Sequence, residues 1–458
     1  MDLIIKNGSI FNSDTRFNAD IAIKNGKIKA LGSQLDLHAR REIDAKGKII
    51  VPGGVDVHTH LKMPFMGTFS ADDYESGTIA AAHGGTTCII DFAIQSNQSL
   101  LETLEVWKKR AFKQSYVDYS FHVAITNADE ENISQIDELA AEGVSSIKVF
   151  MAYKNALMLE DDQLFRVFNA CKKNRILPVI HAENGNIIEE KTKELLKNGQ
   201  YQVKYHAISR HETVEIEAIQ RIIKIASYVD IPIYIVHVST INGAMEILRS
   251  KINGQKVFYE TCPHYLLFND KKYTENIDSA KYVMSPPLRK EYNRTGLRNL
   301  VKDGLVDVVS TDHCPFHFNS QKIMGKDDFS KIPNGVGGIE NRMEVMFNEL
   351  VNKLNASIST YVKCTSTNPA KIFGLYPQKG SVQINSDADL IIIDPEERFE
   401  IHQNSNHENA DYTVYEGYEG VGKIDTVIIN GKVKIQNNHM IVKEKEGQFI
   451  KRKLSGAM

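Results

Sequence analysis

The sequence predicts an α/β protein in which a (β/α)8 TIM barrel is joined to a small β-sandwich domain formed by both chain ends. Eight apolar runs rich in β-branched residues recur through the middle of the chain, and helical patterns separate several of them. Near-continuous apolar strands with helical crossovers are typical of such a barrel. The two ends of the chain contain shorter strands joined by glycine turns. This contrast predicts two kinds of sheet in one molecule.

Length and composition indicate an ordinary globular protein. The chain has 458 residues, of which 42% are hydrophobic and 25% are charged, and this length suggests two or three domains. A formal net charge of −3 argues against nucleic acid or an anionic membrane as a partner. We expect no transmembrane helix, because no apolar run reaches about 18 residues. The first residues lack the order of a signal peptide, and the five cysteines are scattered, which favours the reducing cytoplasm.

Asn-Gly pairs follow several of the apolar strands at the two chain ends. They stand at residues 7–8, 25–26 and 430–431. Asn-Gly between apolar runs is the strongest short-range indication of a β-hairpin, so we expect a tight turn at each pair. Because both ends share this pattern, we expect them to fold together. The predicted domains are the N-terminal part of the sandwich over 1–52, the barrel over 53–375, and the C-terminal part of the sandwich with the tail over 376–458.

The middle of the chain supplies the eight strands that the barrel needs. They are predicted at 54–57, 88–92, 120–125, 146–151, 178–181, 232–238, 257–261 and 306–311. Helices are expected between several of them, at 100–112, 133–141, 162–173 and 214–227. The strand spacing exceeds that of a minimal strand-helix unit. We therefore expect insertions in the loops at 61–84 and 183–213.

Reactive side chains stand where several of these strands end, and the carboxyl ends of barrel strands are where such folds place their chemistry. His58 and His60 end the first strand, and residues two apart on a strand share one face. Histidine and aspartate ligands suit zinc or a similar divalent ion, whereas calcium prefers oxygen ligands. The side chains expected to converge at this rim are His58, His60, Lys148, His181, His237 and Asp312.

Lys148 is the unusual member of this set, because it lies within an apolar strand. A charged ammonium is costly to bury, so burial shifts the group towards its neutral form. A neutral amine can react with carbon dioxide, and the resulting carbamate is an anionic ligand with two oxygens that can bridge two metal ions. The alternative is that Lys148 forms an ion pair with a nearby carboxylate.

Eight segments form a joint set of motifs along the chain: HTHLKMPFMGTFSADD, SIKVFMAYKN, HAEN, HVS, TCPHYL, MSPPLR, TDHCPF and IPNGVGGIENRM. Together they resemble the dihydropyrimidinase/D-hydantoinase branch of the cyclic amidohydrolases, in the amidohydrolase superfamily, over nearly the whole chain. The resemblance implies hydrolysis of the cyclic amide bond of dihydropyrimidines or hydantoins to N-carbamoyl amino acids. It also implies two divalent metal ions, commonly Zn2+ with Mn2+ or Co2+ as alternatives, bridged by a carboxylated lysine and a hydroxide.

The resemblance also implies roles for individual residues. One metal would be held by His58, His60 and Asp312, the other by His181 and His237, and both by Lys148 as N6-carboxylysine. Asp312 would in addition move the proton from the hydroxide to the leaving nitrogen. Tyr153 matches the substrate tyrosine of the family and is a candidate donor to the developing oxyanion, the alternative being loop packing. Ser285 and Asn334 would bind the ureide edge of the substrate through loop backbone.

Apolar residues follow the first and fourth strands, at 63–66 and 156–158. We expect them to contact the ring substituent and to select substrate size and handedness, although ordinary loop packing is the alternative. Among the remaining histidines, His83 is expected to be structural and His264 could line the site. His313 and Cys314 are expected to position Asp312.

Several readings of function remain open at this point. Allantoinase and dihydroorotase share the fold and chemistry. A dihydroorotase must bind a carboxylate, for which an arginine usually follows the second histidine of the first strand. Leu61 follows His60 here, which argues against a dihydroorotase. A non-catalytic scaffold of the same fold is opposed by the complete set of ligand residues. The partners expected are a small cyclic ureide or imide and further copies of the chain, since the family commonly forms homotetramers. The natural ring, its handedness and the metal in the cell are left open.

Overall fold

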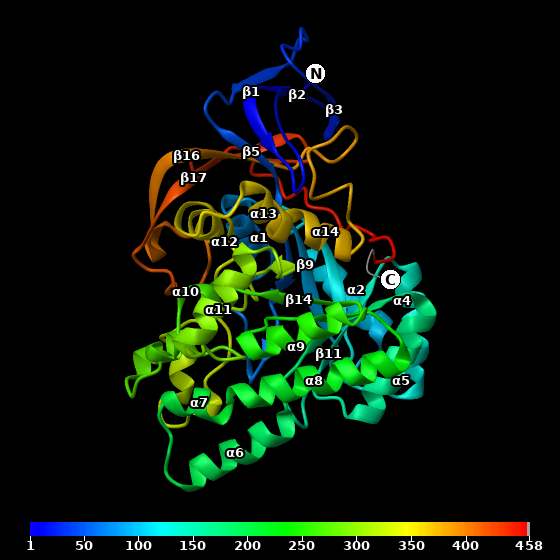
Figure 1. Cartoon of the computed structure of the whole chain (residues 1–458), viewed down its shortest axis with the longest axis vertical. Coiled ribbons are helices and arrows are strands. Elements are labelled where there is room, and N and C mark those ends of the chain that lie inside the picture. Colours follow the sequence, from blue (N-terminus) through cyan, green and yellow to red (C-terminus); the bar gives the residue numbers. More distant parts are fainter. Residues whose placement is uncertain (456–458) are drawn as a thin grey trace.

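The computed structural model describes residues 1–455, and its largest unit is a barrel of eight parallel strands (Figure 1). Neighbouring strands of the barrel sheet pair in sequence order. The strands are β6 (Gly54–Thr59), β9 (Thr86–Ile94), β10 (Asp118–Ala124), β11 (Ser146–Phe150), β12 (Leu177–His181), β13 (Ile233–Ile235), β14 (Val257–Thr261) and β15 (Val308–Val309). All eight correspond to predicted strands, and the predicted fold class is confirmed.

The barrel closes between its first and last strands. Thr59 and His313 form a parallel bridge, and the His60 N–H donates to the His313 oxygen over 2.9 Å. β13 and β15 are shorter than predicted because the chain leaves extended geometry just after them. His237 has a φ of 40° and Asp312 a φ of 52°, in the left-handed region that a regular strand cannot use. Two predicted ligands therefore lie on loops beyond the strand ends.

Helices cover the outside of the barrel, and several begin at a side chain that accepts a backbone N–H of the first turn, as Asp73 and Ser99 do. The helices up to the fifth strand are α1 (Tyr74–His83), α2 (Leu100–Ala111), α3 (Glu130–Ser134), α4 (Ile136–Ala141) and α5 (Asp161–Asn174). The later ones are α6 (Gly185–Lys197), α7 (Lys204–Ser209), α8 (Glu212–Val229), α9 (Ile241–Ile252), α10 (Pro263–Leu267), α11 (Glu291–Lys302), α12 (Arg342–Phe347), α13 (Ile358–Val362) and α14 (Asn368–Ile372).

Two helical predictions differ from the structure in detail. The helix expected over 133–141 is divided at Gln135 into α3 and α4. The insertion expected at 183–213 is itself helical and contains α6 and α7, which lie at the end of the molecule far from the chain termini (Figure 1).

The two chain ends share one mixed sheet of nine strands. Its strands are β1 (Leu3–Phe11), β2 (Arg16–Lys24), β3 (Lys27–Gly32), β4 (Arg41–Asp44), β5 (Ile49–Pro52), β16 (Leu390–Ile401), β17 (Tyr418–Ile429), β18 (Lys432–Gln436) and β19 (His439–Met440). β5 and β16 pair antiparallel, with Val51 opposite Ile391, and this pairing joins the N-terminal strands to the C-terminal ones. The sheet encloses a hydrophobic core of its own, separate from that of the barrel.

The three Asn-Gly pairs do not all form turns. Asn25-Gly26 joins β2 to β3 and Asn430-Gly431 joins β17 to β18, with positive φ at all four residues, as the hairpin turn requires. The prediction for Asn7-Gly8 is wrong, because β1 continues through it with a bulge. A Cβ on Gly8 would lie 2.1 Å from Ile50 Cδ1, so this glycine serves close packing of β1 on β5.

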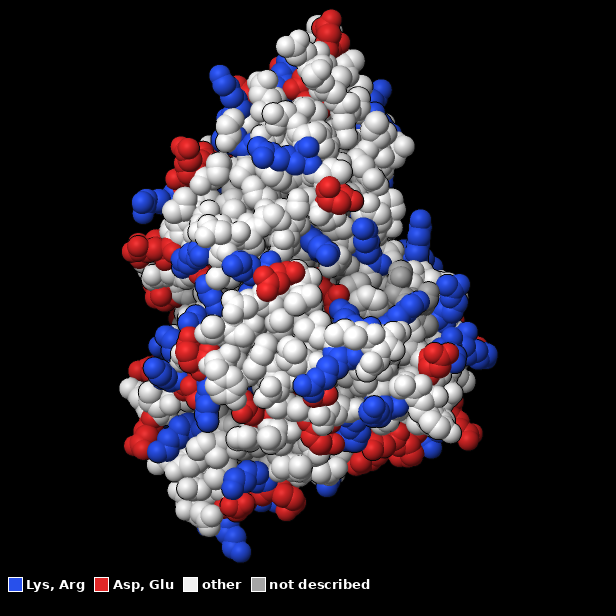
Figure 2. All heavy atoms as spheres, viewed as in Figure 1, with Lys and Arg blue, Asp and Glu red and all other residues white. Residues whose placement is uncertain are grey.

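The C-terminal tail packs on the barrel of its own chain. Gln448 accepts a hydrogen bond of 3.0 Å from the Tyr119 N–H, and the buried Arg452 donates to Ser120 Oγ over 2.9 Å. Residues 456–458 of the tail lie outside the described part. On the face shown in Figure 2, basic and acidic side chains are interspersed, as the small net charge predicts. No helix within residues 1–455 has the length and apolar character needed to cross a membrane.

Candidate active site

The six side chains predicted as metal ligands line one cavity at the carboxyl ends of the barrel strands. Each has an exposed fraction of 9% or less. The remaining wall is mostly apolar and also contains the predicted substrate residues. It consists of Met63, Phe65, Phe150, Tyr153, Leu157, Ser285, Cys314, Asn334 and Gly335. Sequence positions from 58 to 335 thus meet around one small space.

The first ligand group consists of His58, His60 and Asp312. Asp312 Oδ1 lies 2.9 Å from His58 Nε2 and 3.1 Å from His60 Nε2, so both imidazoles face one carboxylate oxygen. Burial raises the pKa of Asp312, but the neighbouring His58 and His60 outweigh it and hold the pKa well below its usual range. The ligand atoms of the three residues lie within 4.8 Å of one another. This group has the donor atoms and the spacing of a divalent metal site.

The second ligand group consists of His181 and His237. His181 Nδ1 and His237 Nε2 are 2.8 Å apart, so the two rings direct their nitrogens at the same point. His181 Nε2 lies 2.8 Å from Glu183 Oε2. A carboxylate accepts hydrogen bonds, and this contact therefore places the His181 proton on Nε2 and leaves a lone pair on Nδ1. Glu183 thus orients the His181 ring.

Lys148 lies on β11 with its amine inside the cavity. Among residues 1–455, its Nζ has no hydrogen-bond partner and forms no ion pair, so the structure gives it no paired carboxylate. The centroids of Phe92 and Phe150 lie 4.8 Å and 5.0 Å from Nζ. Burial in these surroundings lowers the pKa of Lys148 to about 7. The amine is thus close to the neutral state that a reaction with carbon dioxide requires.

These features fit a divalent metal centre. Two groups of imidazole and carboxylate donors face the same cavity, and a buried amine without a partner is costly unless something else binds it. His60 and His237 each have a buried Nδ1 without a hydrogen bond among the described residues, although their Nε2 atoms face the ligand groups. The donor set of imidazole and carboxylate suits zinc, manganese or cobalt better than calcium.

Glu260 supports this cluster and was missed by the sequence reasoning. It lies on β14, its Oε1 is hydrogen-bonded to His58 Nδ1, and its Oε2 accepts from the Tyr234 hydroxyl over 2.7 Å. The contact places a proton on His58 Nδ1 and directs Nε2 towards Asp312, where it can serve as a metal ligand. The signal was available in the sequence, because Glu260 is a charged residue within an apolar strand, as Lys148 is.

Replacing Glu260 with glutamine should weaken metal binding at this centre. The neutral amide keeps the shape but orients the His58 ring less strongly, so we expect affinity to fall by roughly 10- to 100-fold. The measurement is metal retained per chain after dialysis against graded chelator. The matched control is Glu131→Gln, which changes an exposed glutamate on α3 and should retain metal as the unaltered chain does. Equal retention by Glu260→Gln would contradict the role.

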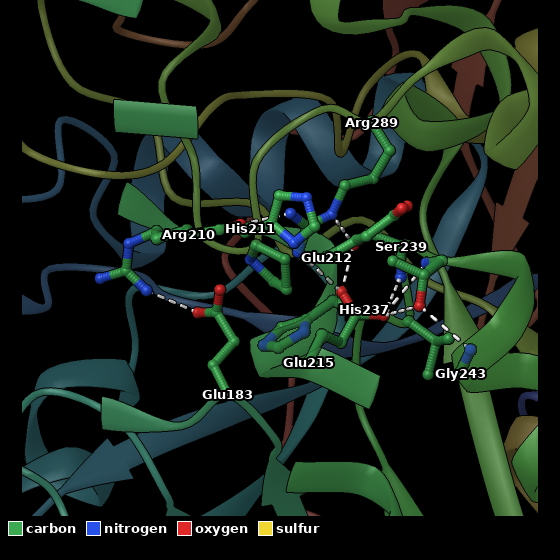
Figure 3. Close-up of polar contacts among 12 residues, drawn as sticks. Glu183, Arg210, His211, Glu212, Glu215, His237, Ser239, Gly243 and Arg289 are labelled. Atoms are coloured by element: carbon green, nitrogen blue, oxygen red, sulfur yellow. Dashed lines mark hydrogen bonds and ion pairs between the residues drawn. The ribbon is translucent and has the colours of Figure 1, made fainter. Parts of the chain in front are cut away.

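Two arginines hold the loops behind the second ligand group (Figure 3). Arg210 donates to Glu183 over 2.6 Å. Burial raises the pKa of Glu183, but Arg210 and His181 outweigh it and lower the pKa to about 2. Arg289 donates to Ser239 Oγ over 2.9 Å and to Glu215 over 3.1 Å. Both arginines therefore fix loops that begin at His181 and His237.

The predicted substrate residues Tyr153, Ser285 and Asn334 line the same cavity. Asn334 Nδ2 donates to Ser285 Oγ over 2.9 Å. Tyr153 has a φ of 65°, which turns its side chain out of the strand direction, and its ring centroid lies 5.4 Å from that of Phe65. Phe65 and Leu157 line the cavity as expected, whereas Met66 and Ala156 line a neighbouring pocket that shares Tyr153 and Asn334 with it.

Two further groups of histidine and carboxylate residues do not have the geometry of a metal site. His83 and His407 stack with ring centroids 3.5 Å apart at 16°, so their in-plane lone pairs run side by side and do not converge. His313 already uses both nitrogens, with Nε2 3.0 Å from Asp72 and Nδ1 accepting from two backbone N–H groups. His83 lies outside the cavity, and its structural role stays a prediction. His313 anchors the chain beside Asp312. His264 is buried and does not line the cavity.

Known proteins are similar to this chain along its full length. Residues 49–434 match the model of the amidohydrolase family. The D-hydantoinase of Geobacillus stearothermophilus is 39% identical over 100% of this chain and 98% of its own, and the dihydropyrimidinase of Rattus norvegicus is 40% identical over 98% and 88%. The crystal structure of the dihydropyrimidinase from Brevibacillus agri NCHU1002 superposes with a TM-score of 0.97 at 38% identity, covering 99% of both chains.

Proposed function

This chain belongs to the amidohydrolase family, and from that membership and the geometry of its site we propose that it opens dihydropyrimidine or hydantoin rings to N-carbamoyl amino acids. It is a hydrolase of cyclic amides, like the D-hydantoinases and dihydropyrimidinases to which it is similar. One observation supports the proposed chemistry most. The Lys148 amine, without a partner among residues 1–455, lies in the same cavity as two groups of metal-binding side chains.

The proposed centre holds two divalent ions, with zinc as the first choice and manganese or cobalt as alternatives. His58, His60 and Asp312 would hold one ion, His181 and His237 the other, and Lys148 both, as N6-carboxylysine. The neutral amine of Lys148 adds to carbon dioxide and releases a proton, which leaves an anionic carbamate. When bound, such ions polarise a carbonyl and lower the pKa of water from roughly 15.7 to about 7.

Asp312 is proposed to move the proton during ring opening. Its carboxylate stays ionised at neutral pH, because the adjacent imidazoles outweigh the effect of burial on its pKa. The carboxylate takes a proton from the attacking water and delivers it to the ring nitrogen as the amide C–N bond breaks. Its position beside both His58 and His60 keeps it next to the place where the water must stand.

Tyr153 is proposed as the donor to the developing oxyanion. Burial raises the pKa of its hydroxyl, so the proton stays on the oxygen at neutral pH. Its ring contacts Phe65 and the Arg210 guanidinium, whose Cζ lies 5.3 Å from the ring centroid. A donor held before the reaction stabilises the charge that forms in the transition state. Ser285 and Asn334 are proposed to bind the ureide edge beside it.

Phe65 and Leu157 are proposed to select the ring substituent. Replacing either with alanine should lower kcat/KM for a hydantoin with a bulky 5-substituent relative to dihydrouracil, by roughly 10-fold, because apolar contact with the substituent is lost. The ratio of the two kcat/KM values is the measurement. Phe69→Ala is the matched control, since Phe69 is half-exposed in the same hairpin and does not line the cavity. An unchanged ratio in both cavity variants would show that other residues select the substituent.

The proposed function is tested with a panel of rings on metal-replete protein. The panel contains dihydrouracil, hydantoin, 5-substituted hydantoins, allantoin and dihydroorotate, and ring opening is the measurement. No arginine of residues 1–455 lines the cavity, so we expect little turnover of dihydroorotate, whose carboxylate needs a cationic partner. Turnover confined to allantoin would identify an allantoinase, and no turnover of any ring would contradict the proposal.

Assembly and location are proposed as well. A homotetramer is proposed by analogy with the common state of the family. The five cysteines are all free and buried, which supports placing the protein in the reducing cytoplasm.

A further inference from the structure

A lysine outside the metal cluster connects the two loops that contain Ser285 and Asn334. Lys322 begins the short 3-10 helix η3 (Lys322–Gly325), and its side chain is fully buried, with an exposed fraction of 0%. Its Nζ donates three hydrogen bonds of 2.7 Å each. The acceptors are the backbone oxygens of Val283, Pro333 and Gly335.

The three acceptors come from both loops. Val283 is two residues before Ser285, and Pro333 and Gly335 stand on either side of Asn334. The loops also touch directly, because the Gly335 N–H donates to the Val283 oxygen over 3.0 Å and Asn334 Nδ2 donates to Ser285 Oγ over 2.9 Å. The Lys322 ammonium thus adds a charged connection to two neutral ones.

The donors of the ammonium match the acceptors in number. A protonated lysine has three N–H donors and no acceptor, so three carbonyls satisfy it in full. Among residues 1–455 it forms no ion pair, and the other contact that stabilises its charge is the face of Phe316, whose centroid lies 5.7 Å from Nζ. Burial lowers the pKa of Lys322 to about 7, whereas three carbonyl hydrogen bonds favour the charged form.

We propose that Lys322 is a positioning residue for substrate binding, whose ammonium sets the spacing between the Ser285 loop and the Asn334 loop. The inference rests on the function proposed above and deepens it. The ammonium also polarises the peptide unit between Pro333 and Asn334, which strengthens the Asn334 N–H as a donor. Without the ammonium, three buried carbonyls lose their donor and the loops separate. The metal ligands do not contact Lys322, so the reaction centre should keep its geometry.

Lys322→Met is the first test, because it keeps the unbranched apolar stem and removes the three donors. We expect KM for the best ring of the panel to rise by roughly 10- to 100-fold while kcat changes by less than about 3-fold. The matched control is Lys331→Met, in the next 3-10 helix, η4 (Phe329–Lys331). Its amine is exposed and pairs only loosely with Asp328 at 3.5 Å, so its KM should equal that of the unaltered chain.

Each outcome decides the inference. An unchanged KM in Lys322→Met overturns it, and so does a fall in kcat as large as the rise in KM, because the reaction centre would then have moved as well. If the methionine variant fails to fold, Lys322→Ala with added ethylammonium replaces it. Ethylammonium should lower the KM of the alanine variant, whereas ethanol of similar size should not, and failure of this rescue overturns the inference.

Amide hydrogen exchange separates this inference from the proposed function. Exchange over residues 283–288 and 332–336 should be faster in Lys322→Met than in the unaltered chain, whether or not any ring is opened. Unchanged exchange there overturns the role of Lys322 even in an active enzyme. Absence of turnover in the unaltered chain, with faster exchange in the variant, contradicts the proposed function alone.

Discussion

Replacing Lys148 with methionine should reduce ring opening by at least about 10³-fold, which corresponds to roughly 4 kcal/mol of transition-state stabilisation. The thioether fills the same space between Phe92 and Phe150 but cannot form a carbamate. Without an anionic ligand shared by both groups, at least one metal ion should be lost. The fold should survive, because the amine makes no hydrogen bond among the described residues that the substitution would break.

Three measurements check this expectation. Metal per chain should fall below two, kcat/KM should fall as stated, and the melting temperature of the metal-free protein should stay close to that of the unaltered chain. A carbon-13 carbamate resonance should appear in the unaltered chain supplied with labelled bicarbonate and be absent from the variant. Lys173→Met, an exposed lysine on α5, is the control and should behave as unaltered. Full turnover by Lys148→Met would rule out a bridging lysine.

Replacing Asp312 with asparagine should have the second largest effect. The amide keeps an oxygen near His58 and His60 but cannot take up a proton as the carboxylate does. We expect kcat to fall by roughly 10²- to 10⁴-fold, the range that a positioned general acid–base group contributes. Metal at the second group should be retained, because no hydrogen bond among residues 1–455 joins His181 or His237 to Asp312.

The measurement is kcat together with metal content, so that a lost proton transfer is distinguished from a lost metal. Asp327→Asn is the control. Asp327 is an exposed aspartate, and its replacement should leave kcat unchanged. If Asp312→Asn kept both metals and full kcat, another group would have to move the proton.

The sequence predicted the parts of this structure that depend on local pattern. All eight barrel strands could be found, because apolar β-branched runs are the direct consequence of burial on both faces. The six side chains of the cluster followed, because strand ends of a barrel share one rim. The local pattern cannot predict which side chains contact each other in the folded chain. Lys148 and Glu260 have the same appearance in the sequence, but only the fold shows that one lacks a partner and the other binds His58.

The wrong predictions likewise concern positions where tertiary contacts, and not local pattern, decide the backbone. Asn7-Gly8 and Asn25-Gly26 are the same dipeptide, yet one is a bulge and the other a turn, because Gly8 packs against Ile50 from a neighbouring strand. The strand predicted over 232–238 was too long, since the left-handed backbone at His237 is set by tertiary contacts and not by residue type. Lys322 could not be singled out, because its three acceptors are backbone oxygens, whose positions depend on how two loops fold and not on residue type.

The pairing of β5 with β16 has a consequence for how the polypeptide matures on the ribosome. β5 ends at Pro52, but the strand that covers its edge begins at Leu390, after the whole barrel has been made. During synthesis the backbone groups along this edge of β5 therefore stay unpaired until β16 has been made. Nascent chains with an unpaired strand edge attract chaperones or pair with one another. The sheet is thus completed late, when β16 pairs with β5 after the barrel has been made.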